Sequence, residues 1–333
     1  MMVLDVIAVA LMILCVSVFG LVLSLIVAGV DRKIVARLQH RIGPVWYQPF
    51  LDIWKLLYKQ NTIPAEAVRA VYNAAPIAAL ATALLALFYL PLGDMPPLMS
   101  QHGDAILVLY VLLLPSLAMV VGGFSSASPY AVIGAQREMI TMVAYELPLA
   151  AVIITWAWKL SSLGIANPFS LEVMAANPIW HNVGPLGFIG VVLMGGIMLL
   201  VLPAEVGRIP FDSPEAETEL AGGVLVEYSG RNLALFQLSL HVKTIAMAAL
   251  IVTLFIPWSF SSVAFLPLSA GMTILTGFLF FLLKISVVIF LGMTVLRAAC
   301  ARLRITQIVK VYWHILGSAA LFALFLIVLD AKL

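Results

Sequence analysis

Residues 204–230 read AEVGRIPFDSPEAETELAGGVLVEYSG, and this stretch holds six of the 16 acidic residues of the 333-residue chain. Only one basic residue, Arg208, lies within this stretch, and Arg231 comes directly after it. The whole chain is 63% hydrophobic and only 10% charged, with a mean hydropathy of +1.12. Soluble globular chains average about 25% charged residues, so we expect lipid to surround most of this protein. The acidic stretch is therefore an exception that needs an explanation.

Eight apolar segments are long enough to cross a bilayer, which takes roughly 20 residues per helix. They predict an all-α, polytopic membrane protein with one transmembrane domain over residues 1–333. The first segment lacks a basic start and a small-residue cleavage site, so we interpret it as a retained span and not as a signal peptide. The expected spans are about 3–29, 72–92, 104–124, 139–159, 186–204, 235–257, 269–296 and 310–329.

The lysines and arginines predict the orientation of these spans. Seven of them lie in the first connection, 31–70, and eight more lie in or beside the later odd-numbered connections. The even-numbered connections hold only Lys159. By the positive-inside rule we expect the odd connections in the cytoplasm and both termini outside a cell inner membrane. The basic segment 31–70 and the acidic segment 204–232 are then both cytoplasmic.

The segment QPFLDIWKLLYKQ, residues 48–60, is too short to span a membrane. Phe50, Ile53, Trp54, Leu57 and Tyr58 fall on one helical face, which indicates an amphipathic helix lying in the membrane interface. A re-entrant piece packed inside the protein is the alternative.

Two acids and a tyrosine lie in the fourth span, whose start reads GAQREMITMVAYELPLA. Glu138 and Tyr145 are seven residues apart and share a face, whereas Glu146 is turned away by roughly 80°. Pro148 removes the backbone hydrogen bond to residue 144 and loosens the turn beside Glu146. A buried carboxylate beside a tyrosine suits a proton relay, and a structural pair that holds helices together is the alternative.

The acidic stretch itself predicts a short helix that starts at Asp212, because Asp212 and Glu215 have capping-box spacing and Pro214 suits a first turn. Asp212, Glu215 and Glu219 would then share one face, with Glu217 turned away. Like charges so close require bound protons, or bases supplied from elsewhere. With Glu205 and Glu227 they suggest a site of proton uptake and relay at the membrane boundary, and a solvated acidic loop is the alternative.

Lys284 lies near the middle of the seventh span, where a lysine needs an acid partner or a depressed pKa. Structural pairing and a relay role are both open from the residues alone. The five histidines are scattered, and interfacial anchoring is the expectation for most of them, although His241 beside Lys243 could line a polar path.

Nothing in the sequence provides redox or nucleophilic chemistry. Cys15 and Cys300 are far apart, and the chain has no CxxC pair, no cluster of metal-ligand residues and no phosphate-binding glycine loop. We therefore expect no catalytic residue, metal or cofactor in this chain, and no nucleic acid partner. Any electrons must move in a partner protein.

Four blocks of sequence, taken together, resemble one known family. They are RIGP and QPFLDIWKLLYK after the first span, GAQREMITMVAYE in the fourth, the acidic stretch, and LRAACARLRITQ after the seventh. In this order, across essentially the whole chain, they are similar to the membrane subunit that joins the hydrophilic and membrane arms of respiratory complex I. The resemblance implies that buried acids couple a redox reaction in attached subunits to ion movement in antiporter-like neighbours.

The resemblance and the residue chemistry together give two candidate sets. The proton-relay set is Glu138, Tyr145, Glu146, Glu205, Asp212, Glu215, Glu217, Glu219, Glu227 and Lys284. The partner-interface set is Arg37, Arg41, Gln48, Asp52, Lys55, Arg208, Phe211, Arg231, Arg302 and Arg304.

Two departures from the quinone-reducing enzymes stand out. Only residues 45–47 separate Gly43-Pro44 from Gln48-Pro49, and Ile305-Thr306 replace a tyrosine–aspartate pair. With FIPW at 255–258, these features resemble the corresponding subunit of membrane-bound NiFe hydrogenases and formate hydrogenlyases. That resemblance implies a ferredoxin- or formate-linked complex that translocates protons or sodium ions. Its partners would be an iron–sulfur small subunit and a catalytic large subunit with the iron–sulfur clusters and NiFe centre on the cytoplasmic side, and antiporter-like membrane subunits.

Three alternatives follow from the same residues. The first is a subunit lining the quinone site of an NADH:quinone oxidoreductase. The second is a stand-alone secondary transporter, which predicts internal inverted repeats that the sequence does not show. The third is a membrane anchor without a coupling role.

Overall fold

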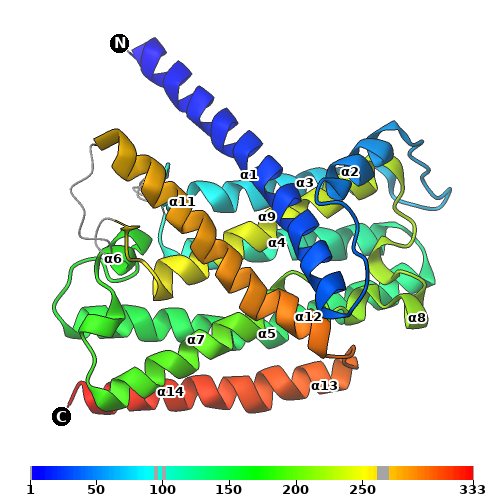
Figure 1. Ribbon diagram of the computed structural model, residues 1–333. Helices are drawn as coiled ribbons and strands as arrows, with labels where there is room; N and C mark the ends of the chain where they lie inside the picture. The colour runs from blue at the N-terminus through cyan, green and yellow to red at the C-terminus, as the bar shows by residue number, and fades with distance from the viewer. Residues whose placement is uncertain (1, 94–96, 100–102, 261–269, 333) are drawn as a thin grey trace.

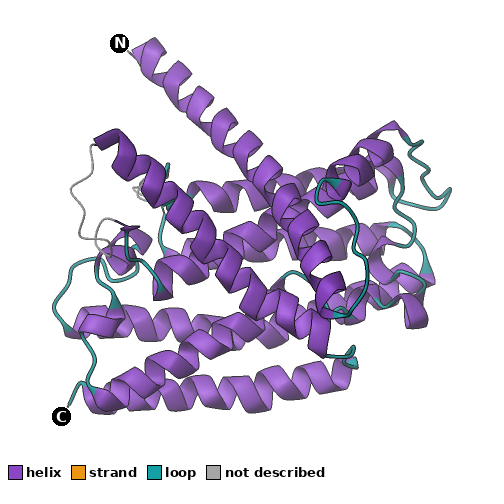
Figure 2. Ribbon diagram, viewed as in Figure 1, coloured by secondary structure: helices purple, strands orange, loops and turns teal. Residues whose placement is uncertain are grey.

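The computed structural model describes residues 2–93, 97–99, 103–260 and 270–332. Figure 2 shows helices and loops, and no strand, in these residues. Eight of the described helices are long and apolar enough to cross a membrane, which confirms the predicted all-α polytopic class. These spans are Val9–Leu38, Arg69–Phe88, Ala105–Ser125, Pro129–Ser162, Pro185–Glu205, Gly230–Phe255, Leu275–Ala299 and Ile305–Asp330. The predicted start of the seventh span, residue 269, lies outside the described residues.

The helices follow one another along the chain with short connections (Figure 1). Two π-helical segments, η5 and η6, interrupt the last two spans, and such segments often mark functional sites. The α-helices are α1 (Met2–Leu38), α2 (Gln48–Tyr58), α3 (Arg69–Phe88), α4 (Ala105–Ser125), α5 (Pro129–Ser162), α6 (Leu171–Ala176), α7 (Pro185–Glu205), α8 (Glu217–Leu220), α9 (Gly230–Phe255), α11 (Ala270–Ile289), α12 (Val295–Ala299), α13 (Ile305–Val309) and α14 (Gly317–Asp330). The 3-10 turns are η2 (Ile179–His181), η3 (Ser213–Glu215) and η4 (Gly223–Leu225), and the π-helical segments are η5 (Phe290–Thr294) and η6 (Lys310–Leu316).

Helices α1 and α5 extend beyond their predicted ends. Helix α1 continues past residue 29 to Leu38, and α5 begins at Pro129 instead of residue 139. Two charged residues in these extra turns, Asp31 and Arg137, have partners: Arg297 lies 3.0 Å from Asp31, and Glu219 lies 2.5 Å from Arg137. Because these charges are paired with other segments, the helices do not have to end where the apolar residues end.

The odd-numbered connections meet at one end of the bundle, at the right of Figure 1. Val68 N donates to Ser125 O at 3.0 Å, which joins the first connection to the third. Asp212 and Arg302 lie 2.9 Å apart and join the fifth to the seventh. The segments that the positive-inside rule assigned to one side are therefore neighbours in space.

The even-numbered connections gather at the opposite end, where Trp180 Nε1 donates to Phe255 O at 2.7 Å. Figure 1 shows both chain termini toward this side of the view. This arrangement agrees with eight spans. Which end faces the cytoplasm stays a prediction.

Helix α9 is the central element. Every residue of its most apolar 18-residue window is buried, and it packs against α1, α2, α3, α4, α7 and α11. Small residues such as Ala246, Ala248 and Ala249 let the neighbouring backbones approach closely. Any polar side chain on this helix therefore lies in the middle of the protein.

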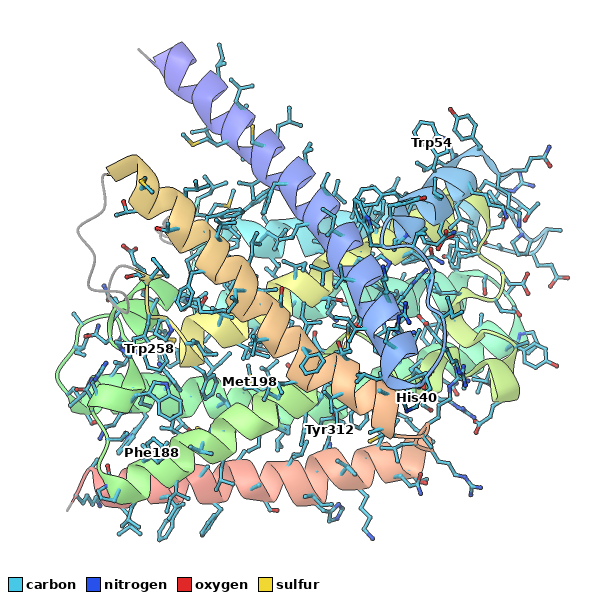
Figure 3. All side chains as sticks on the ribbon, viewed as in Figure 1. His40, Trp54, Phe188, Met198, Trp258 and Tyr312 are labelled. Carbon is cyan, nitrogen blue, oxygen red and sulfur yellow. The ribbon has the colours of Figure 1, made fainter. Side chains whose placement is uncertain are left out.

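The predicted amphipathic helix is present as α2. Its buried residue Ile53 packs against Leu25 of α1 and Ala234 of α9. Trp54 projects outward from α2 in Figure 3 and is 62% exposed, and Tyr58 is 76% exposed. The location of this exposed face in the membrane interface stays a prediction.

Candidate functional site

The centre of the candidate site is an ion pair between two helices. Glu205 is the last residue of α7, and Lys243 lies midway along α9. The Lys243 ammonium nitrogen lies 2.8 Å from Glu205 Oε1, and neither side chain has exposed surface. Lys243 also donates a hydrogen bond of 2.7 Å to Ser116 Oγ on α4. Desolvation opposes the burial of both charges, so stability alone does not account for this pair.

Helix α5 brings two further groups to the pair. Glu138 and Tyr145 are both buried and share one face of α5, as their spacing predicts. Glu138 interacts electrostatically with Lys243 and Glu205, and Tyr145 with Glu205 and Glu138. Ser116, which accepts from Lys243, also interacts with both residues, and the buried Tyr145 hydroxyl makes no direct hydrogen bond among the described residues. Three of the predicted relay residues thus surround one buried lysine.

Glu146 lies at the edge of this cluster. It is half-buried on α5 between the exposed side chains of Val143 and Leu147, and its charge acts on Glu205. The cluster therefore extends from the centre of the bundle toward the outer face of α5.

The acidic stretch does not form the single helix that its spacing predicts, and this expectation is wrong. Residues Ser213–Glu215 form a 3-10 turn, and α8 begins only at Glu217. Asp212 makes no side-chain capping hydrogen bond. Pro214 allows only a short turn here, and Ala221 and Gly222 then end α8 with positive φ angles of 53° and 109°.

The acids of this stretch point to different partners instead of sharing one face. Asp212 pairs with Arg302 at 2.9 Å, and Glu219 pairs with Arg137 at 2.5 Å. Bases from elsewhere thus neutralise part of the charge. The half-buried Glu227 lies beside Tyr72, whose hydroxyl donates to Glu227 O at 2.7 Å. The side chain of Glu217 lies outside the described residues.

The stretch packs closely against α5, so it is not a freely solvated loop. Glycine is required at two contacts. A Cβ on Gly134 of α5 would lie 2.5 Å from Val224 N, and a Cβ on Gly223 would lie 1.7 Å from Pro214 O. Gly223 also has a φ of 58°, which favours glycine. Backbone contact at these two positions holds the acids beside the bundle.

A polar pocket of about 190 Å³ opens at the end of the bundle where the odd connections meet. Arg208, Asp212, Glu215, Arg297 and Arg302 line it. Burial lowers the pKa of the Arg208 guanidinium from its ordinary value, and the nearby Glu215 carboxylate counteracts this effect. Since arginine stays charged in proteins, the pocket combines fixed positive charges with carboxylates.

A second cavity of about 20 Å³ lies deeper in the protein and shares Arg208 and Arg297 with the pocket. A space of this size holds roughly one water molecule. Asp31 and His241 also line it, and Arg208 Nη2 lies 3.5 Å from His241 Nδ1. His241 is only 6% exposed, so it belongs to the polar interior and does not anchor an interface.

Phe211 was predicted to face a partner, but its side chain is only 4% exposed. Its ring packs edge-on against Tyr312 of η6, with 5.0 Å between the ring centroids. Tyr312 in turn donates to Leu200 O at 2.7 Å and interacts electrostatically with Glu205. Phe211 of the acidic stretch thus packs on a tyrosine that the charge of Glu205 influences.

Lys284 is not part of this cluster. Its ammonium donates to Ile256 O at 2.9 Å and to Trp258 O at 3.0 Å, and it lies over the Phe280 ring. These carbonyls follow the C-terminal end of α9, at the end of the bundle away from the acidic stretch. These contacts favour a capping role, and the relay role of Lys284 stays a prediction.

Most of the predicted partner-interface residues lie at the surface. Gln48 and Arg32 both bind Asp52, at 3.0 and 2.8 Å, which fixes α2 against α1. Arg208 is turned inward toward His241. The exposed members are Arg37, Arg41, Lys55, Arg231, Arg302 and Arg304.

The sequence reasoning did not identify four residues that complete the site. Asp31 accepts a hydrogen bond of 2.6 Å from Thr294 and pairs with Arg297. Ser116 and Lys243 belong to the central cluster, and Tyr312 borders it. Lys243 gave a usable signal, because it is a lysine inside a predicted span, but it was considered only as a topological charge and as a neighbour of His241 on a polar path.

The chain is similar to known proteins along most of its length. Residues 9–328 match the family described as NADH dehydrogenase. The chain is 33% identical to a subunit of the NADH-quinone oxidoreductase of Brevibacillus brevis, over 89% of this chain and 85% of the relative. It is also 33% identical to the same subunit of the enzyme from Geobacillus sp., over 94% of this chain and 91% of the relative. Among solved structures, it superposes on a chain of the membrane-bound sulfane sulfur reductase, an archaeal respiratory membrane complex, with a TM-score of 0.81 and 28% identity over 96% of this chain and 99% of that chain.

Proposed function

The chain belongs to the NADH dehydrogenase family, and from that premise we propose that it relays protons between its polar pocket and its buried Glu205–Lys243 cluster. It is a membrane subunit of a complex I-like respiratory complex. The proposed role is to couple electron transfer in attached subunits to the movement of protons or sodium ions through neighbouring membrane subunits.

The observation that carries this proposal is the composition of the cluster. Glu138 and Glu205 are two carboxylates with one buried cation, Lys243, between them. Insertion of a single charge into the centre of a membrane helix costs about 2.5–3.5 kcal/mol. With both carboxylates ionised the cluster would carry a net negative charge in a medium of low dielectric constant, so one exchangeable proton restores neutrality.

The groups are ordered for a transfer between the two carboxylates. Tyr145 interacts with both Glu138 and Glu205. As the Glu138 carboxyl group gives its proton to the Tyr145 hydroxyl oxygen, that hydroxyl gives its own proton to the Glu205 carboxylate. No atom is left with an extra proton, and the negative charge moves from Glu205 to Glu138. Lys243 can follow the charge because it pairs with Glu205 at 2.8 Å and also interacts with Glu138.

The polar pocket supplies the opposite end of the proposed relay. Its carboxylates and arginines lie where the odd connections meet, and exposed basic residues such as Arg37, Arg41 and Arg304 surround that end. We expect this end to be cytoplasmic and to dock the soluble redox subunits, the proposed iron–sulfur small subunit and catalytic large subunit. Glu146 at the outer face of α5 would lead toward the antiporter-like membrane subunits.

The experiment is a measurement of the gradient formed per electron transferred. The purified complex is reconstituted in vesicles and driven with NADH or with reduced ferredoxin, whichever it accepts, while a dye reports the internal pH. Glu205→Gln should lower the gradient per electron at least about tenfold, as expected for loss of a positioned proton carrier. The matched control is Glu66→Gln, the same change at an exposed acid. A wild-type ratio in Glu205→Gln would refute the relay and support an anchor without a coupling role.

The names of the relatives and the sequence favour different electron acceptors for the complex. The names of the sequence relatives favour a quinone-linked complex. The short segment between Gly43 and Gln48 supports the hydrogenase-type reading instead. Extraction of the purified complex answers this: bound quinone supports the first reading, whereas stoichiometric nickel supports the second. A stand-alone transporter would instead move ions when the chain is reconstituted without any redox subunit.

A further inference from the structure

Helices α1 and α11 run side by side across the front of Figure 1, and contacts join α1 to α11 and to the following segment η5 at two levels. At one level, Phe19 and Phe278 pack edge-on with ring centroids 5.3 Å apart. At the other, Thr294 of η5 donates to Asp31 at 2.6 Å. Between these two contacts lies a groove of about 240 Å³.

The groove is apolar and open to the surface. Aliphatic side chains from both helices line most of it. Val30 on one wall is 41% exposed and Phe290 on the other is 37% exposed, so the groove opens sideways from the bundle. The only carboxylate in its described lining, Asp31, already pairs with Arg297. An occupant inside the groove therefore needs to be apolar and uncharged.

Basic residues follow both walls of the groove at the same end. Val30 and Ile34 line the groove, and Lys33 and Arg37 lie on the same face of α1 at helical spacing of three or four residues. Both basic side chains are exposed. On the opposite wall, Arg297 follows Thr294 by one turn. The apolar groove thus ends at three basic residues, Lys33, Arg37 and Arg297, on the side where the odd connections meet. We call these residues the basic rim.

The length of the groove fits one leaflet of a bilayer. Its lining on α1 runs from Leu23 to Ile34, which is about 16 Å at the helical rise of 1.5 Å per residue. Half of a hydrocarbon core that is roughly 30 Å thick is about 15 Å. A chain that enters from the basic rim would therefore reach the middle of the membrane near Leu23, at the far end of the groove.

We propose that the groove between α1 and α11 is a binding site for one acyl chain of an anionic phospholipid, whose phosphate is held by Lys33 and Arg37. The chain fills the space between the two helices that protein side chains leave open. The phosphate lies at the basic rim, where each lysine or arginine near a membrane surface attracts anionic lipid. The bound lipid would fix α1 against η5 and so support the Asp31–Arg297 contact.

Native mass spectrometry of the complex, released from nanodiscs, tests the site. The probe is phosphatidylglycerol in a phosphatidylcholine background. Ile285→Trp fills the groove from α11 and should remove one retained phosphatidylglycerol per complex. Leu283→Trp is the matched control, because Leu283 lies on the same helix, is 57% exposed and does not line the groove.

A second variant tests the rim without altering the groove. Lys33→Gln with Arg37→Gln should lower the preference for phosphatidylglycerol over phosphatidylcholine about tenfold, since each charge contributes to the attraction. Equal lipid retention in wild type and Ile285→Trp would overturn the proposal. So would a quinone mass at the site, or density for a helix of a neighbouring subunit in the groove.

Discussion

Lys243 on α9 and Glu205 at the end of α7 form an ion pair of 2.8 Å in which both side chains are completely buried. They are 38 residues apart in the sequence, and the acidic stretch lies between them. The same lysine binds Ser116 at 2.7 Å. Four spans, α4, α5, α7 and α9, therefore meet at one cation, and a change there has consequences for both stability and proton transfer.

Replacement of Lys243 by methionine should destabilise the protein strongly. The variant keeps the volume of the side chain but leaves Glu205 buried without its cation, and breaking a buried pair in this way costs about 3–5 kcal/mol. Thermal unfolding of the purified complex measures the effect. Glu205→Gln combined with Lys243→Met should recover much of the loss, because no uncompensated charge remains. If the losses of the two single variants simply add in the double variant, the two groups are not paired.

The Asp212–Arg302 contact should matter for the position of the acidic stretch more than for stability. Arg302 is 37% exposed, and partly exposed ion pairs contribute only about 0–1 kcal/mol. Arg302→Glu places like charges together and should raise protease cleavage within residues 206–222. The exchanged pair, Asp212→Arg with Arg302→Glu, should restore protection. If the exchange restores nothing, the pairing does not hold the stretch in place.

Alkaline pH should destabilise the protein through Tyr228. Burial raises the pKa of its phenol from 10.0 to about 12. Between these values the unfolded chain loses the proton while the folded protein keeps it, so the free energy of unfolding falls as the pH rises from 10 to 12. Tyr228→Phe has no such proton and should flatten this part of the curve of unfolding temperature against pH. A variant with the wild-type slope would contradict the assignment.

The spans could be predicted because lipid imposes a length and an apolar composition that a sequence displays directly. Charge asymmetry identified the odd connections, which contact one another in the structure. Glu138 and Tyr145 were correctly placed on one face of α5 and Glu205 at the end of α7, although Glu205 was grouped with the acidic stretch and not with the other two. Their positions on span faces or at a span end contain that information.

The partners of these residues could not be predicted, because they depend on which helices pack together. Asp31 pairs with Arg297 across 266 residues, and no local pattern links the two. The helix expected from Asp212 failed for a different reason. Capping-box spacing describes local preference only, whereas here proline, positive-φ residues and the contact with Gly134 determine the backbone path.

Gly134 should tolerate no larger residue. Its Cβ would lie 2.5 Å from Val224 N, so Gly134→Ala must push the acidic stretch away from α5. Overpacking of this kind costs about 1–3 kcal/mol. Gly196→Ala on α7 is the control, because nothing lies within 4 Å of its Cβ, and alanine there should stabilise the helix by up to about 1 kcal/mol. Unfolding temperatures measure both, and equal effects would show that the contact at Gly134 is not close.

Lys284 should act as a cap at the end of α9. Its ammonium holds the carbonyls of Ile256 and Trp258 beyond the end of α9, and Lys284→Met leaves these part-buried acceptors without that donor. The expected loss is about 1–3 kcal/mol of stability, with the gradient formed per electron unchanged in the fraction that stays folded. Lys284→Arg keeps a donor there and should recover part of the stability. If Lys284→Met keeps its unfolding temperature but loses the gradient, the relay role is correct and the capping interpretation is wrong.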